Sequence, residues 1–132
     1  MSETAHILAK AYPEESQIQY LRAVYGSITI GSMLSTLEML EQSGIPLGNT
    51  TGLYLAAAAA QNDVFQGITK PLTSLLVGES PAAAHKPLNR LTEVGLIVDS
   101  GELAVRSNGK GARANIYLPT EVGEVALGLI VP

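Results

Sequence analysis

The stretch that decides the fold is GESPAAAHKPLNRLTEVGLI, residues 78–97. Ser80 is a favourable N-cap, and Pro81 suits the first helical position, where a backbone N–H has no acceptor within the helix. Gly95 is placed to end the helix in a left-handed conformation. The sequence therefore predicts a helix over residues 80–94, followed at once by an apolar strand.

Apolar and polar side chains fall on different faces of this predicted helix. Leu88, Leu91 and Val94 recur at three-residue spacing and share one face. The other side carries polar and basic residues, namely His85, Lys86, Asn89 and Arg90. One face is suited to packing and the other to contact with a polyanion. A merely solvated polar face is the alternative interpretation.

The elements before this stretch are predicted to be helical. An apolar helical pattern runs over residues 14–43, and Gly26 and Gly31 leave open whether it forms one bent helix or two. This apolar face is longer than a small domain can cover, which favours contact with a second copy of the chain. The dimer interface predicted on it consists of Ile18, Leu21, Tyr25, Ile28, Met33, Leu37 and Leu40.

Two further helices are expected between that pattern and the opening stretch. One covers residues 52–62, where a run of alanines favours close helix packing, and a short one covers 71–77. The polar residues just before them, 49–51 and Thr69, are expected to cap them. Because Gly78 makes a turn between two short helices, the pattern predicts a helix-turn-helix.

The chain after the opening stretch is predicted to form short strands. Residues 96–98 and 103–105 are strand-like, with a turn at Ser100-Gly101, and 115–118 is a further strand. Asn108-Gly109 is the strongest hairpin signal in the chain. These strands would form a wing beside the helix-turn-helix.

A final helix is expected from Glu121 to about Gly128, capped by Thr120. The predicted fold is then mainly α with a small β-hairpin wing, an α+β class. The 132 residues are enough for one core, so we expect a single domain over 1–132. Within it we expect a tail over 1–12, dimerisation helices over 13–44, and a winged helix-turn-helix over 49–128.

The composition of the sequence argues against several classes of protein. The sequence contains no cysteine, which excludes a disulfide framework and a thiolate metal site. Its start lacks a basic region followed by a long apolar run, and no apolar block reaches the ~20 residues that a bilayer requires. We expect a soluble cytoplasmic protein without a membrane partner. No Ser/His/Asp arrangement, metal-ligand cluster or phosphate-loop spacing is present, so we expect neither an enzyme nor a cofactor.

Charge is unevenly distributed along the chain. The net charge is −4 and the sequence pI is about 5.0, which argues against nucleic-acid binding through overall charge. Six of the eight lysines and arginines nevertheless fall between residues 64 and 118. They are Lys70, Lys86, Arg90, Arg106, Lys110 and Arg113. The basic residues thus gather on the predicted helix-turn-helix and wing.

The order of elements over about Leu34 to Leu127 resembles the MarR family of winged-helix transcriptional regulators. Leu88-x-x-Leu91-x-x-x-Gly95-Leu96-Ile97 resembles that family's recognition helix and the strand after it. Arg113-Ala114 followed by Leu118-Pro119-Thr120-x-x-Gly123 resembles its wing arginine, returning strand and last helix start. The resemblance implies a homodimer whose recognition helices enter the DNA major groove and whose wings reach the minor groove.

Three features depart from the family pattern. Pro87 falls within the predicted recognition helix, where it is expected to produce a kink. Gly111 occupies the place of the acidic residue that usually orients the wing arginine. The sequence ends at Pro132 without the long C-terminal helices that complete the family's dimer.

We therefore predict a sequence-specific double-stranded DNA-binding regulator, favoured as a repressor, acting as a homodimer. The predicted DNA-binding residues are Lys70, Ser80, Ala82, Ala83, His85, Lys86, Asn89, Arg90, Arg106, Asn108, Lys110 and Arg113. A small-molecule effector is compatible with the resemblance, although no named residue requires one. The alternative is a winged-helix module that binds a protein partner through the apolar face of residues 18–40 and does not contact DNA.

Overall fold

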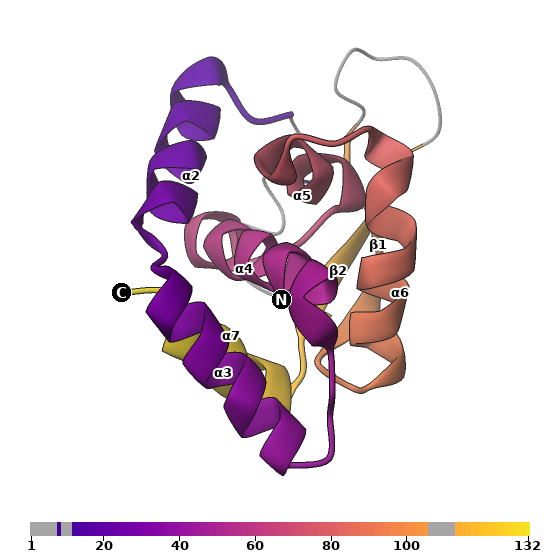
Figure 1. Ribbon diagram of the computed structural model, residues 1–132. Coiled ribbons are helices and arrows are strands. Elements are labelled where there is room, and N and C mark those ends of the chain that lie inside the picture. The colour runs from indigo at the N-terminus through magenta and orange to yellow at the C-terminus, as the bar shows by residue number, and fades with distance from the viewer. Residues whose placement is uncertain (1–7, 9–11, 106–112) are drawn as a thin grey trace.

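The computed structural model describes residues 8, 12–105 and 113–132 (Figure 1). Its elements, in order, are α2 (Glu15–Ser27), α3 (Ile30–Gln42), α4 (Gly48–Phe65), α5 (Lys70–Val77), the 3-10 helix η1 (Pro81–Ala84), α6 (His85–Glu93), β1 (Ile97–Leu103), β2 (Asn115–Pro119) and α7 (Glu121–Ile130). The two strands form an antiparallel sheet. The structure confirms the predicted mainly helical α+β class.

Helix α4 is the central element (Figure 1), and it packs against α2, α5, α6 and α7. Every residue from Tyr54 to Gln61 is buried, and the alanine run lets neighbouring helices approach closely. The predicted central helix is confirmed, but its start is not. The helix begins at Gly48, so residues 49–51 lie in its first turn and none of them caps it.

The apolar pattern over residues 14–43 forms two helices. Ile28 and Thr29 take extended backbone conformations between α2 and α3, and the Thr29 hydroxyl accepts a hydrogen bond from the Ser32 N–H at 3.1 Å. This N-cap fixes the break. The alternative of two helices is therefore the one that the structure adopts, and the break lies between the two glycines.

Part of the predicted dimer interface is wrong. Ile18, Leu21 and Leu40 are 7%, 0% and 1% exposed, and residues of the same chain cover them. The other four side chains predicted for the interface are partly buried against the chain's own core clusters, namely Tyr25, Ile28, Met33 and Leu37. The face is long because two helices wrap around α4, so it serves the internal core and leaves little for a second copy.

The sheet differs from the predicted pair of strands over 96–98 and 103–105. One irregular strand, β1, joins most of the first segment to Leu103 of the second, and its register against β2 shifts between Asp99 and Leu103. Ala104 and Val105 lie beyond it. Within the irregular part, Asp99 Oδ1 accepts a hydrogen bond from the Gly101 N–H at 2.8 Å, and Gly101 has a φ of 83°. The predicted turn is thus a bulge inside a strand.

The helix predicted over 80–94 is divided. η1 ends at Ala84 and α6 begins at His85, which places Pro87 in the first turn of α6. A first-turn residue has no acceptor for its N–H within the helix, so proline is tolerated there. The irregularity expected from Pro87 takes the form of a change from 3-10 to α geometry between Ala84 and His85. Gly78 and Gly95 have φ values of 86° and 82°, as expected for left-handed helix ends.

Helix α7 begins as predicted and runs two residues further. The Thr120 hydroxyl accepts a hydrogen bond from the Gly123 N–H at 3.0 Å, which confirms the cap. Gly123 lies so close to the Leu96 carbonyl oxygen that no Cβ would fit. This close approach joins the start of α7 to the start of the sheet.

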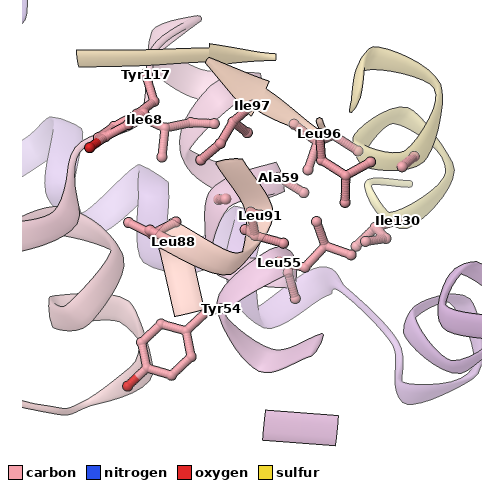
Figure 2. Packing of buried hydrophobic residues seen from close by; sticks show 14 of the residues in the cluster. Tyr54, Leu55, Ala59, Ile68, Leu88, Leu91, Leu96, Ile97, Tyr117 and Ile130 are labelled. Carbon is pink, nitrogen blue, oxygen red and sulfur yellow. The ribbon is translucent and has the colours of Figure 1, made fainter. Parts of the chain in front are cut away.

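The buried side chains come from all parts of the fold. Figure 2 shows Leu55 and Ala59 of α4 beside Leu88 and Leu91 of α6, with Ile97 of β1 above them. Burial of such side chains is the dominant favourable term in folding. The apolar face of α6 is therefore fixed in the core, and its polar face is left outside.

Candidate nucleic-acid interface

A buried polar network joins α4 to α5 and positions the residues of the candidate interface. Gln61, which is 0% exposed, accepts hydrogen bonds through Oε1 from the Thr69 N–H at 2.8 Å and from the Thr69 hydroxyl at 3.1 Å. Its Nε2 donates to the Thr73 hydroxyl at 2.8 Å. Thr69 occupies the N-cap position of α5 as predicted, but its side chain makes no capping hydrogen bond and its hydroxyl donates to Gln61. The network fixes the first residue of α5, Lys70.

The segment before α5 is also tied to the sheet. Ile68 and Tyr117 exchange two backbone hydrogen bonds, at 2.9 and 2.7 Å. As a result, the Lys70 ammonium lies over the Tyr117 ring, 5.8 Å from its centroid. This distance is within the range of a cation–π interaction. Two segments that are distant in sequence, 68–70 and β2, thus meet around one cation.

The ammonium of Lys70 also contacts α6. Its Nζ lies 3.0 Å from His85 Nδ1 and donates to Asn89 Oδ1 at 3.2 Å. Because an ammonium has only donors, Nδ1 accepts in this contact and the ring proton lies on Nε2. No carboxylate in the described part of the chain pairs with Lys70. Its positive charge is therefore held by neutral acceptors and is not compensated.

A hollow of about 450 Å³ lies beside this cation and is called the Lys70 hollow. It is lined by Lys70, Pro71, Pro81, Ala82, His85, Arg113, Ala114, Asn115 and Tyr117. Asn115 is held there by its side-chain amide, which donates to Asp99 Oδ2 at 2.8 Å. The structure thus brings Arg113, an exposed residue at the start of the returning strand, to the same hollow as Lys70 and His85.

A second hollow of about 610 Å³ lies between α4 and α6 and is called the Tyr54 hollow. Its lining includes Thr50, Thr51, Tyr54, Lys86 and Arg90. Arg90 is held by a hydrogen bond from its guanidinium to the Pro46 carbonyl at 3.3 Å and by an exposed ion pair with Glu93 at 3.9 Å. Lys86 is exposed and makes no hydrogen bond or ion pair with described residues.

The predicted DNA-binding residues occupy different environments. His85, Lys86, Asn89 and Arg90 are exposed on one side of α6, as predicted. Ser80 is exposed in the N-cap position of η1, but its side chain makes no capping hydrogen bond. Ala82 is exposed and Ala83 is half-buried, and they border the Lys70 and Tyr54 hollows respectively.

Three predicted wing residues, Arg106, Asn108 and Lys110, lie outside the described residues, as does Gly111. The predicted Asn-Gly hairpin tip lies outside them too. Of the described residues after 112, those that line the Lys70 hollow are Arg113, Ala114, Asn115 and Tyr117.

Sequence reasoning missed the residues that position the interface. In the sequence, Gln61 is a polar residue within a predicted helix and Tyr117 is a residue of a predicted strand, and neither position suggests a role in the interface. Their roles depend on which distant segments become neighbours, and no periodicity carries that information. A glutamine inside an otherwise apolar helix pattern was the one available signal, because a buried amide requires hydrogen-bond partners.

No group of three or more histidine, cysteine, aspartate or glutamate side chains is arranged to hold a metal ion in the described part of the chain. Among the same residues, no helix is long and apolar enough to cross a membrane. No protein-family model, curated protein or solved structure matches this chain. The geometry of the two hollows and of α6 is therefore the basis for assigning a function.

Proposed function

We propose that the protein is a double-stranded DNA-binding transcriptional regulator of the winged helix-turn-helix type, with α6 as its recognition helix. The observation that carries this proposal is the uncompensated cation of Lys70, held against His85 and Asn89 beside the exposed Arg113. Phosphate contacts from lysine and arginine dominate the affinity of proteins for DNA. The order α5, turn, α6 and paired strands supports the MarR-like assignment.

The hydrogen bonds of Lys70 also determine what α6 presents. Since His85 accepts through Nδ1, its Nε2–H is left to donate outward. Asn89 likewise uses Oδ1 toward Lys70 and keeps its two amide N–H groups. Outward donors match phosphate oxygens and the N7 and O6 acceptors of guanine. We therefore expect guanine at the bases that His85 and Asn89 contact.

A homodimeric repressor remains part of the proposal, but with a different dimer surface. Exposed aliphatic side chains occur on α3 and α7, namely Ile30, Leu34, Val122, Val125 and Leu129. Contact through these helices would leave α6 free for DNA. The same side chains favour the second candidate function, a module that binds another protein, which the net charge of −4 also suits.

Fluorescence anisotropy with labelled duplexes tests the proposal. One labelled duplex would be selected from a random library by binding to the protein. Its affinity would be compared with that of an unselected duplex at ~50 mM salt. We expect tighter binding to the selected duplex, and a log–log salt slope that falls by about one in Lys70→Ala. Arg22→Ala, an exposed cation on α2, is the matched control and leaves the slope unchanged. Absence of binding to either duplex would favour the protein-binding function.

A further inference from the structure

The Tyr54 hollow contains features that DNA-base recognition by α6 does not use. It opens at the first turn of α4, an 18-residue helix without a side-chain N-cap. Gly48, with a φ of 79°, is the first residue of α4, so the N–H of Thr50 belongs to the first turn and that of Thr51 follows directly after it. First-turn N–H groups have no acceptor within the helix and carry the positive end of its dipole.

Tyr54 points to a ligand independently of the helix start. The residue is only 5% exposed, and it borders the hollow. Figure 2 shows its phenol directed away from the aliphatic side chains of the core. Its hydroxyl forms no hydrogen bond with any described residue. The hydroxyl oxygen is not among the fully buried, unpartnered atoms of the described residues, so it reaches the hollow and can donate to a group that enters it.

Two cations complete the lining. Lys86 is exposed and unpaired within the described residues, and Arg90 is anchored to the Pro46 carbonyl at 3.3 Å. The anchor keeps the guanidinium beside the start of α4. The only carboxylate on the lining is that of Glu93, which pairs with Arg90 at 3.9 Å. The hollow thus combines amide N–H groups, a hydroxyl donor and cations on one concave surface. Groups of these kinds bind phosphate in proteins.

We propose that the Tyr54 hollow binds a phosphate group, held by the first turn of α4, the Tyr54 hydroxyl, Lys86 and Arg90. The assignment of this phosphate to a DNA backbone rests on the proposed function, whereas the site itself does not. Lys86 and Arg90 form the row of α6 next to the one formed by His85 and Asn89. A duplex held by α6 would then place one phosphate strand at the Lys70 hollow and the other at the Tyr54 hollow.

NMR titration of the ¹⁵N-labelled full chain with inorganic phosphate tests the site. We expect the amide signals of Thr50 and Thr51 to shift in a saturable way. Tyr54→Phe should weaken this binding about tenfold to a hundredfold, because it removes one hydrogen bond to a charged group without removing any internal one. Tyr20→Phe, at an exposed position of α2, is the matched control and leaves the binding unchanged. Thr50 and Thr51 signals that do not move with phosphate or with duplex would overturn the proposal.

A duplex arm separates the two sources of the phosphate group. If the duplex shifts the same amides and Tyr54→Phe weakens duplex binding by a similar factor, the occupant is a backbone phosphate. If free phosphate shifts them and the duplex neither shifts them nor competes, the site holds a small anion, which supports the site and removes its DNA role. If the duplex binds with these amides unmoved and Tyr54→Phe is without effect, the site is overturned while the proposed function stands.

Discussion

Pro87 shows how one residue can constrain a helix without kinking it. An uninterrupted helix over 80–94 would bring the Pro87 ring against the carbonyl of Ala83. The chain avoids this contact by ending η1 at Ala84 and restarting as α6 at His85. The proline position then costs nothing in hydrogen bonding. A change from 3-10 to α geometry is set by such contacts, which is why the capping signals alone predicted a single helix.

We expect Pro87→Ala to change the free energy of unfolding by less than about 1 kcal/mol, because the third residue of a helix has no N–H acceptor to gain. Thr92→Pro, by contrast, would remove an internal hydrogen bond of α6 and should cost about 3 kcal/mol. Urea denaturation of both variants measures the difference. Equal losses would contradict the position assigned to Pro87.

We expect Tyr25 to make the free energy of unfolding depend on pH in the alkaline range. Burial, and to a smaller extent the neighbouring Tyr54, raise the pKa of the Tyr25 phenol above its ordinary value of 10.0. Well below pH 10 the phenol is protonated in both states and its contribution is fully present. As the pH rises further, the unfolded chain releases the proton first, so the free energy of unfolding falls.

Tyr25→Phe should therefore reduce the loss of stability between about pH 9 and 11, where tyrosine ordinarily titrates. Urea midpoints measured at half-unit pH steps give the slope. Tyr20→Phe is the control, since Tyr20 is 61% exposed and its phenol meets solvent in both states. A Tyr25→Phe slope identical to that of the unmodified chain would contradict this account.

At the scale of elements, α4 and α5 are joined by the Gln61 network. Gln61→Leu would leave the Thr69 N–H buried without an acceptor, and such a loss costs about 1–3 kcal/mol. Because Lys70 follows Thr69, we also expect weaker duplex binding under conditions where the variant is folded. Asp63→Ala, at an exposed site of the same helix, should leave both properties unchanged. Thermal unfolding and anisotropy measure the two effects.

Helix α7 is positioned by a glycine that approaches Leu96, the residue before β1. A Cβ at Gly123 would collide with the Leu96 carbonyl oxygen, whereas one at Gly128 would meet nothing within 4 Å. Gly123→Ala should therefore destabilise the protein by about 3 kcal/mol. Gly128→Ala should stabilise it by about 0.5–1 kcal/mol, because it removes helix-disfavouring backbone freedom. Melting temperatures that move in the same direction would contradict this packing.

Local signals predicted the elements better than their partners. Caps and left-handed glycines gave the turn at Gly78, the end at Gly95 and the start of α7, since each depends on adjacent residues. Periodicity found the apolar face of α2 and α3 but assigned part of it to a second chain. The error arose because periodicity shows that a helix face is apolar but not which element covers it. Here the covering element is α4, which lies further along the sequence.

At the scale of the whole molecule, the chain combines a net charge of −4 with cations gathered around one helix. The charge count along the sequence predicted this concentration. It could not predict the two hollows, because the Lys70 hollow joins residues from α5, η1, α6 and β2, and the Tyr54 hollow joins α4 to α6. An acidic remainder disfavours non-specific adhesion to DNA, so the proposed duplex binding would depend on the local cations.

The central claim is that α6 and its flanking cations contact a duplex, and NMR mapping tests it most directly. A short selected duplex would be added to ¹⁵N-labelled protein at low salt. We predict that shifted amides concentrate at Lys70, η1, α6 and residues 113–117. Shifts confined to α3 and α7, or no shifts at duplex concentrations in excess of the protein, would contradict the claim.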